Sequence, residues 1–234
     1  MLTLHHLENS RSQRILWLLE ELGIEYQVKR YARDKTTNLA PPELFKVHPL
    51  GKSPVITDGD QLVAESGLIV EYLVEKYGNG RLAPAVGTPQ HLQYRYWLHY
   101  AEGSFMPLMI LTLILGKMET APMPFFAKPI ARKLASKARD AYSGPNVIRN
   151  LQYLEDTLQK STWFCGDEMT GADIMMSFPV EAAAQRVDLG GKYPALKGFL
   201  DRIKALPAYQ RAIEKGGPYT VSYTHLRAHE TKAN

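Results

Sequence analysis

The alternation of apolar and polar positions at the start of the chain predicts strands and helices in turn. Leu2 to His5 is a short strand candidate, and leucine and isoleucine at positions 15, 18, 19 and 22 give one apolar face to a helix over Ser12 to Leu22. Gly23 ends that helix, and Ile24 to Tyr31 predicts a second strand. This order predicts a parallel strand pair joined by a right-handed crossover.

A β-hairpin is predicted further along, after a polar loop and a brief helical turn near Leu44. Val55 to Thr57 and Gln61 to Ala64 are apolar runs around an Asp-Gly turn, which is a strong hairpin signal. Pro54 stands at the entrance of the first strand, where a residue without an N–H is tolerated. If the Ser53-Pro54 bond is cis, the Ser53 main chain faces outward and can pair with an extended, peptide-like ligand.

The hairpin leads directly into another helical pattern that ends near Tyr77. Glu65 and Ser66 stand at its start, so a carboxylate, a hydroxyl and a helix N-terminus come together at one point. With the Ser53 main chain nearby, these groups suit a small peptide with charged ends.

A stretch rich in glycine and proline separates this α/β part from a helical remainder. We place a first domain over residues 1–80, a linker over 81–89, a helical domain over 90–221 and a tail over 222–234. His91 to Leu115 is expected to form one long helix bent at Pro107. Thr170 and Asp173 fit a capping box at the start of a buried helix.

Two apolar stripes support the helical assignment of the second part. They are Val147, Leu151, Leu154 and Leu158 in one helix, and Leu196, Phe199, Leu200 and Ile203 in another.

Composition excludes several classes of protein. The 234 residues are 45% hydrophobic, enough for a full core, and the single Cys165 excludes a disulfide framework and a Cys-x-x-Cys redox pair. No signal sequence is apparent, and the longest apolar run, Phe105 to Leu115, is too short to span a bilayer. We therefore expect a soluble cytoplasmic protein without membrane association.

The net charge of +4 raises the question of nucleic-acid binding. Basic residues gather over positions 128–139, yet no aromatic residues alternate with them and no nucleic-acid motif accompanies them. A solvated helix face is the better interpretation of this cluster.

The polar tail carries His225 and His229, whose spacing allows metal binding on one helix face. The favoured interpretation is a non-native terminus that resembles translated synthetic sequence. No metal is expected.

Four motifs in sequence order resemble the cytosolic glutathione transferases, specifically the Gtt-type branch of fungi and bacteria. They are His5 to Arg14 followed by Trp17 to Gly23, Ala40 to Leu44, His48 to Pro54, and Gly171 to Pro179. The resemblance covers nearly the whole chain up to the tail. It implies a thioredoxin-like N-terminal domain with an all-helical C-terminal domain, glutathione as co-substrate, and a homodimer.

The residue that activates the glutathione thiol is expected at the turn before the first helix. In serine-type relatives a hydroxyl occupies this turn, and the resemblance leaves Ser10 and Asn9 as the two candidates, with Ser10 preferred. A helix N-terminus and a hydroxyl or amide donor both stabilise a thiolate. Ser10 and Gln13 also fit a capping box, so the alternative is that Ser10 only starts the helix.

The resemblance also implies the rest of the glutathione site. Ser53, preceding Pro54, pairs main chain to main chain with the cysteinyl part, while Glu65 and Ser66 hold the γ-glutamyl amine and carboxylate. Lys52 is a candidate for the glycyl carboxylate, with a solvated loop lysine as the alternative.

In this family the second substrate lies between the domains, against the first long helix of the second domain. Candidates are soft, apolar side chains on that helix: Tyr100, Phe105, Met106, Met109 and Ile110.

The predicted function is therefore a glutathione transferase for detoxification, which conjugates hydrophobic electrophiles and also reduces peroxides. A glutathione-binding or scaffold protein of the same fold without turnover is the alternative. A cysteine-based disulfide reductase is disfavoured because Cys165 is far in sequence from the first helix.

Overall fold

The structure is a computed structural model that describes residues 1–217; the predicted tail with His225 and His229 lies outside the described residues. The chain forms two compact units. The first contains residues 1–79 together with 203–217, and the second is Gly80–Arg202. The second unit begins beside the predicted linker. The helical segment from Ile203 onward, which lies within the predicted domain over residues 90–221, packs as part of the first unit.

A four-stranded sheet forms the centre of the first unit, in the order β2-β1-β3-β4. The strands are β1 (Leu2–Leu7), β2 (Gln27–Tyr31), β3 (Val55–Asp58) and β4 (Gln61–Ala64). β1 runs parallel to β2 and antiparallel to β3, and β3 and β4 form the predicted hairpin. The parallel opening pair and the hairpin are thus confirmed, although β1 is longer and β2 shorter than predicted.

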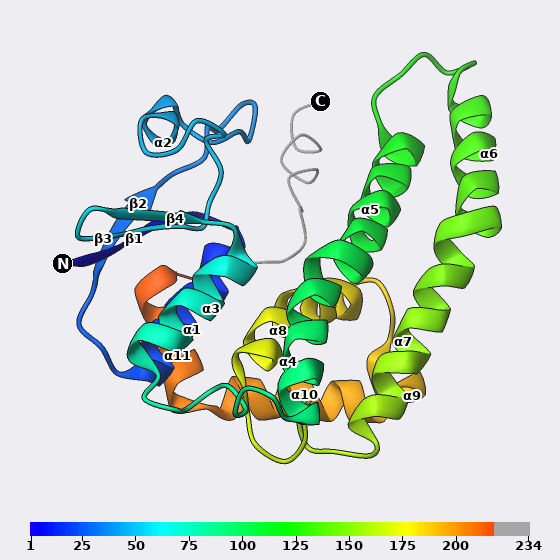
Figure 1. The fold of residues 1–234 in the computed structure, drawn as a ribbon. Coiled ribbons are helices and arrows are strands. Elements are labelled where there is room, and N and C mark those ends of the chain that lie inside the picture. Colours follow the sequence, from blue (N-terminus) through cyan, green and yellow to red (C-terminus); the bar gives the residue numbers. More distant parts are fainter. Residues whose placement is uncertain (218–234) are drawn as a thin grey trace. The chain divides into compact units, whose positions relative to one another are not determined.

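Three helices accompany the sheet in this part of the chain: α1 (Ser12–Leu22), α2 (Pro42–Phe45) and α3 (Ser66–Tyr77). Figure 1 shows α1 and α3 side by side on one face of the sheet, with α2 on the other side. α1 has the predicted bounds and ends at Gly23, whose φ of 67° is easily adopted only by glycine. These elements bring the ends of β1 and β3 and the starts of α1 and α3 to one region.

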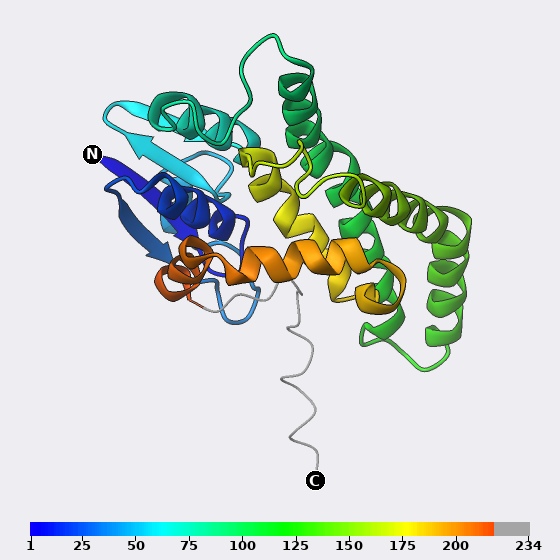
Figure 2. The same ribbon diagram turned by 90° about the horizontal axis from the view of Figure 1, so that it is seen from below.

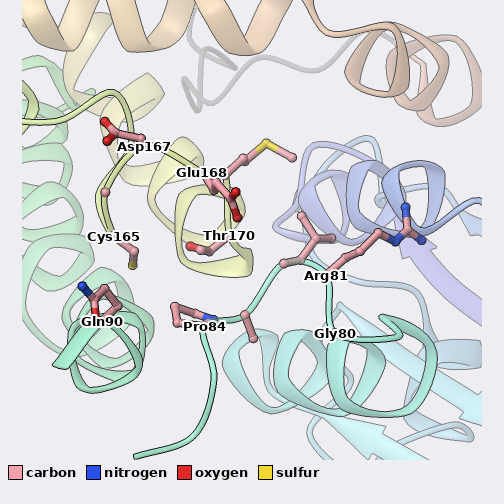
Figure 3. Close-up of a pocket in the computed structure, with 12 residues that line it drawn as sticks. Gly80, Arg81, Pro84, Gln90, Cys165, Asp167, Glu168 and Thr170 are labelled. Atoms are coloured by element: carbon pink, nitrogen blue, oxygen red, sulfur yellow. The ribbon is translucent and has the colours of Figure 1, made fainter. Parts of the chain in front are cut away.

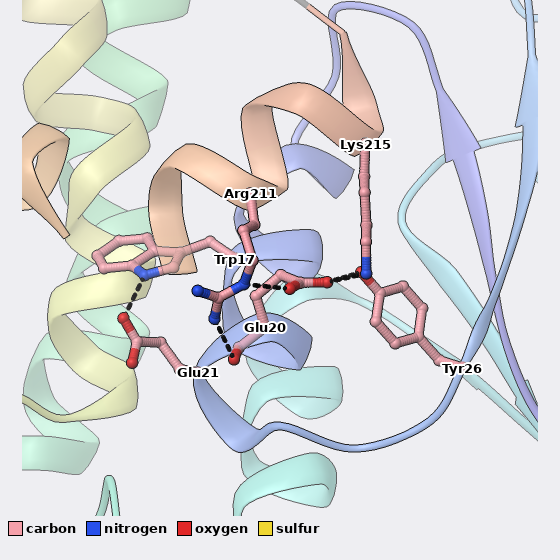
Figure 4. Close-up of polar contacts among 6 residues, drawn as sticks. All are labelled: Trp17, Glu20, Glu21, Tyr26, Arg211 and Lys215. Carbon is pink, nitrogen blue, oxygen red and sulfur yellow. Dashed lines mark hydrogen bonds and ion pairs between the residues drawn. The ribbon is translucent and has the colours of Figure 1, made fainter. Parts of the chain in front are cut away.

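α1 is buried on nearly all sides, more than a single apolar stripe predicts. The reason is α11 (Pro207–Gly216), which packs on α1 although it is far away in sequence. Glu20 is the polar link between the two helices (Figure 4): Arg211 Nε donates to its Oε2 at 2.8 Å, and Lys215 Nζ and the Tyr26 hydroxyl donate to its Oε1. Burial acts to raise the pKa of Glu20, but these three donors together hold it below its ordinary value.

Glu20→Gln is expected to loosen α11, lowering the free energy of unfolding by about 1 kcal/mol, because the two cations that lose their anionic partner are half exposed. A glutamate with a lowered pKa stabilises the folded state above its unfolded pKa, and this contribution disappears as the pH falls through the folded value. The stability difference from wild type should therefore shrink as the pH falls below the ordinary value of 4.5. Urea unfolding at several pH values measures it.

Glu25, an exposed glutamate shortly after α1, provides a matched control. Glu25→Gln should leave the free energy of unfolding nearly unchanged, since surface substitutions usually alter it by less than about 0.5 kcal/mol. Equal losses of stability in Glu20→Gln and Glu25→Gln would contradict the role of Glu20 in holding α11.

The second unit is helical. Its elements are α4 (Pro89–Tyr100), a π-helical turn (Ala101–Phe105), α5 (Met106–Thr120), α6 (Lys128–Ala138), a second π-helical turn (Arg139–Ser143), α7 (Gly144–Leu158), α8 (Gly171–Ala184) and α9 (Leu189–Lys192). α10 (Pro194–Ala205) starts in this unit and ends in the first. Figures 1 and 2 show α5 and α6 as antiparallel neighbours.

The predicted long helix with Pro107 continues through the proline. The π-helical turn Ala101–Phe105 immediately precedes α5, and Pro107 is the second residue of α5, in its first turn, where a residue without an N–H is tolerated. The resulting segment, residues 89–120, is long and apolar enough to cross a bilayer by length and composition only, a test that core helices of soluble proteins also pass.

Asp173 begins α8 and confirms the predicted capping box with Thr170. The carboxylate is fully buried and accepts hydrogen bonds from the Phe164 N–H at 2.8 Å, the Thr170 N–H at 2.8 Å and the Thr170 hydroxyl at 2.9 Å. Burial raises the pKa of Asp173 to about 6, while these donors act in the opposite direction. Asp173 thus fixes both the start of α8 and the preceding loop.

Candidate functional site

Ser53 offers an unpaired main-chain edge, as the sequence hypothesis required. The Ser53-Pro54 bond is cis. The Ser53 hydroxyl donates to the His5 carbonyl oxygen at 2.9 Å and accepts from the Leu7 N–H at 3.2 Å, which anchors the residue to the end of β1. Within residues 1–217 its own main-chain N–H and C=O have no hydrogen-bond partner. Both groups are therefore available to an extended ligand.

The Ser10 hydroxyl lies beside this edge. Ser10 Oγ is 3.5 Å from Ser53 Oγ, and Ser10 is only 7% exposed. The predicted capping box with Gln13 is wrong: α1 begins at Ser12, and the Gln13 amide donates to the Ala212 carbonyl oxygen on α11 at 2.8 Å. Ser10 Oγ instead accepts the Ser12 N–H at 3.2 Å, a bond that does not use the hydroxyl proton of Ser10.

Asn9 lies on the same turn but in a different conformation. Its φ of 50° is in the left-handed region, which asparagine tolerates better than most residues. Its carbonyl oxygen accepts from Arg33 Nη2 at 3.2 Å, and Arg33 Nε also donates to the Glu8 carbonyl oxygen at 2.9 Å. Arg33 therefore fixes the backbone of the turn. On this turn it is the Ser10 hydroxyl that lies beside Ser53. Which of Ser10 and Asn9 contacts a bound thiol stays a prediction.

Glu65 has a strained backbone that the sequence did not reveal. Its φ of 73° and ψ of 126° lie outside the ordinary regions for a residue with a side chain. Such conformations cost about 1–3 kcal/mol and occur preferentially where a ligand is held. The Glu65 side chain is exposed and has no partner within residues 1–217. An exposed carboxylate is thus presented at the start of α3.

The Arg14 guanidinium and the N-terminus of α3, which begins at Ser66, place positive charge next to Glu65. Ser66 is the first residue of α3 and is 4% exposed, and its hydroxyl accepts from Arg14 Nη2 at 3.3 Å. Arg14, on α1, is only 2% exposed. A guanidinium beside a helix N-terminus attracts a carboxylate. Arg14 could not be identified from the sequence, because a single arginine in a buried helix gives no signal of which residues it faces.

For the remaining predicted site residues, the described contacts do not indicate which ligand group they would bind. Lys52 is exposed and forms no ion pair within the described part of the chain. Of the five second-substrate candidates, Tyr100, Phe105, Met106 and Met109 are buried in the helical unit, at 8% exposure or less, and Ile110 is exposed at 37%. Their contact with a second substrate stays a prediction.

A cavity of about 560 Å³ lies in the helical unit, between residues 80–84 and the loop 165–170 (Figure 3). None of the five second-substrate candidates lines it. Cys165 does, but burial raises the pKa of its thiol to about 12, so it remains protonated and unreactive near neutral pH. Among residues 1–217 no group of three histidine, cysteine, aspartate or glutamate side chains is arranged to hold a metal ion.

Comparison with known proteins agrees with this arrangement. Residues 1–75 match the family described as "Glutathione S-transferase, N-terminal domain", and residues 107–207 match "Glutathione S-transferase, C-terminal domain". The chain is 35% identical to glutathione S-transferase 1 of Saccharomyces cerevisiae over 92% of its own length and 95% of that protein. It is 36% identical to glutathione S-transferase 3 of Schizosaccharomyces pombe, covering 92% and 88% of the two chains.

A solved structure is also similar. The crystal structure of a glutathione S-transferase from Actinobacillus pleuropneumoniae is 34% identical, with a TM-score of 0.77 and coverage of 94% of both chains. Sequence and fold lead to the same conclusion: this chain belongs to the glutathione S-transferase family, with fungal glutathione S-transferases among its relatives.

Proposed function

We propose that the protein is a glutathione transferase that activates the glutathione thiol for conjugation to hydrophobic electrophiles and for peroxide reduction. The observation that carries this proposal is the unpaired Ser53 main chain next to the buried Ser10 hydroxyl, at the N-terminal end of α1. A cysteinyl residue paired with Ser53 would bring its sulfur close to Ser10.

Activation requires a lower thiol pKa. A free thiol ionises with a pKa of about 8.5, so only a small fraction is thiolate at neutral pH. A hydrogen bond from the Ser10 hydroxyl and the partial positive charge at the start of α1 both favour the anion. A decrease of about two pKa units needs roughly 2.7 kcal/mol of differential stabilisation, which these two effects can supply together.

The γ-glutamyl end would be recognised at the start of α3. Glu65 pairs with the ammonium group, and the carboxylate binds at Ser66, where the helix N-terminus and the Arg14 guanidinium supply positive charge. Lys52, with no competing partner in residues 1–217, would neutralise the glycyl carboxylate.

Glu65→Gln is expected to weaken glutathione binding about ten- to a hundredfold, because a charge-assisted bond to the ammonium contributes roughly 1.5–3 kcal/mol. Isothermal titration with glutathione measures the change, and the fold should remain intact because the side chain has no intramolecular partner within residues 1–217. Glu75→Gln, exposed on the same helix, is the matched control and should bind normally. Normal affinity in Glu65→Gln would leave Glu65 as a residue that only starts α3.

The alternative function is a glutathione-binding or scaffold protein without turnover. Rates measured with a panel of electrophiles, peroxides and disulfides in the presence of glutathione separate the two: a binder turns over none of them. We expect the transferase to act in detoxification, in the cytoplasm and as a homodimer. Sedimentation of the purified protein tests the dimer.

A further inference from the structure

A chain of buried polar groups links the Ser10 hydroxyl to the end of α11. Ser12 Oγ lies 2.8 Å from Ser10 Oγ and 2.8 Å from His6 Nδ1. On the other side of the imidazole, His6 Nε2 lies 3.3 Å from the Gly216 carbonyl oxygen. Ser10, Ser12 and His6 are 7%, 0% and 2% exposed. Since little water reaches these groups, they satisfy their hydrogen-bonding needs mainly with one another.

The Gly216 carbonyl determines the direction of the protons in this chain. A carbonyl oxygen can only accept, so His6 Nε2 carries a hydrogen and donates it. Burial lowers the pKa of His6 to about 4, so near neutral pH the ring is neutral and Nδ1 is an acceptor. Ser12 therefore donates its hydroxyl to His6 Nδ1, because its other acceptor, the Leu7 carbonyl oxygen, is farther away at 3.4 Å.

Because Ser12 donates its hydrogen bond to His6, its oxygen can only accept a hydrogen bond from Ser10. Ser12 has one hydroxyl proton, and it is engaged in the hydrogen bond to His6 Nδ1. In the absence of ligand Ser10 then donates to Ser12 at 2.8 Å in preference to Ser53 Oγ at 3.5 Å. Ser10 has only one hydroxyl proton. The hydrogen bond that it donates to Ser12 therefore competes with the hydrogen bond that it would donate to the glutathione sulfur.

We propose that His6 is a positioning residue that restrains thiol activation: it acts through Ser12 and keeps the Ser10 hydroxyl directed away from the sulfur until a thiolate competes for it. This inference rests on the proposed role of Ser10. A thiolate accepts more strongly than a neutral hydroxyl because it is charged, so Ser10 turns to the sulfur when the thiol loses its proton to water. Ser10 must then give up its bond to Ser12. The bound thiol is therefore less acidic than it would be without Ser12.

Ser12→Ala tests the competition directly. Without the Ser12 oxygen, the Ser10 proton is free for the sulfur, and the acid dissociation constant of the bound thiol should rise about two- to tenfold, the strength of one neutral hydrogen bond. Ultraviolet thiolate absorbance of the glutathione complex across a pH series measures it. An unchanged or smaller dissociation constant overturns the inference, because Ser12 would then not compete for the Ser10 proton.

His6→Phe tests the imidazole itself. Without the Nδ1 acceptor, the Ser12 hydroxyl divides its donation between Ser10 Oγ at 2.8 Å and the Leu7 carbonyl oxygen at 3.4 Å, so the thiol should become more acidic, though by less than in Ser12→Ala. In a Ser12→Ala background the same change should have no further effect. A purely structural role for His6 would lower the melting temperature in both backgrounds and leave the thiol pKa unchanged, which contradicts the proposal. If Ser12→Ala does not fold, His6→Phe alone still decides.

Ser10→Ala separates a failure of this inference from a failure of the proposed function. If Ser10→Ala raises the bound-thiol pKa and Ser12→Ala does not lower it, the role of His6 is refuted and the function of Ser10 stands. If Ser10→Ala leaves the bound-thiol pKa unchanged, both fail.

Discussion

Replacing Ser10 with alanine is expected to slow conjugation by about ten- to a hundredfold, equivalent to roughly 1.4–2.7 kcal/mol of lost transition-state stabilisation. The physical reason is the loss of the Ser10 hydroxyl, which lies 3.5 Å from Ser53 Oγ. We expect this hydroxyl to donate a hydrogen bond to the sulfur of a glutathione whose cysteinyl main chain pairs with Ser53. Steady-state rates with a chromogenic electrophile measure the change. Glutathione affinity should fall less than the rate, because Ser53, Glu65 and Ser66 still hold the peptide.

Asn9→Ala is the control on the same turn. A slower rate in Asn9→Ala with a normal rate in Ser10→Ala would transfer the thiol contact to Asn9. Because the φ of Asn9 is 50°, alanine also strains the turn, so Asn9→Gly, which tolerates this conformation, should accompany it. Under our proposal Asn9→Gly retains most of the rate.

Asp173→Ala is expected to have the largest effect on stability, a loss of roughly 2–6 kcal/mol. The substitution leaves the buried main-chain N–H groups of Phe164 and Thr170 without acceptors, and each costs about 1–3 kcal/mol. Asp173→Asn keeps one oxygen and should lose about half as much. Chemical denaturation of the two variants measures both changes.

Asp167→Ala provides the comparison for Asp173. Asp167 is an exposed aspartate on the loop that precedes α8, so its removal should alter the free energy of unfolding by less than about 0.5 kcal/mol. Equal effects at positions 167 and 173 would show that burial and hydrogen bonding of Asp173 are not what stabilises this region.

Elements with strong local signals were predictable from the sequence. The Asp-Gly turn between β3 and β4 and the glycine after α1 each demand a conformation that few other residues adopt, so the hairpin and the end of α1 have the predicted positions. The Thr170 and Asp173 capping box was predictable for the same reason: the two residues that satisfy each other are three positions apart.

Features that depend on distant contacts could not be predicted. The side chain of Gln13 bonds to Ala212 on α11, so a pattern that fits a local cap serves a tertiary contact instead. Arg14 faces Ser66, and His6 reaches Gly216, through contacts that exist only after the chain has folded. The resemblance to a known family supplied the roles of Ser53 and Glu65, but neither the unpaired main chain of Ser53 nor the strained backbone of Glu65 follows from residue types.

The thiolate content of the bound complex tests the central claim most directly. A pH series of ultraviolet absorbance spectra of the unmutated protein with glutathione gives the ionisation of the bound thiol without assuming any second substrate. Our account predicts a bound-thiol pKa about two units below the free value of about 8.5, and therefore a clear thiolate signal at neutral pH. Tight binding of glutathione with an unshifted thiol pKa would contradict the proposed transferase and favour the non-catalytic binding protein.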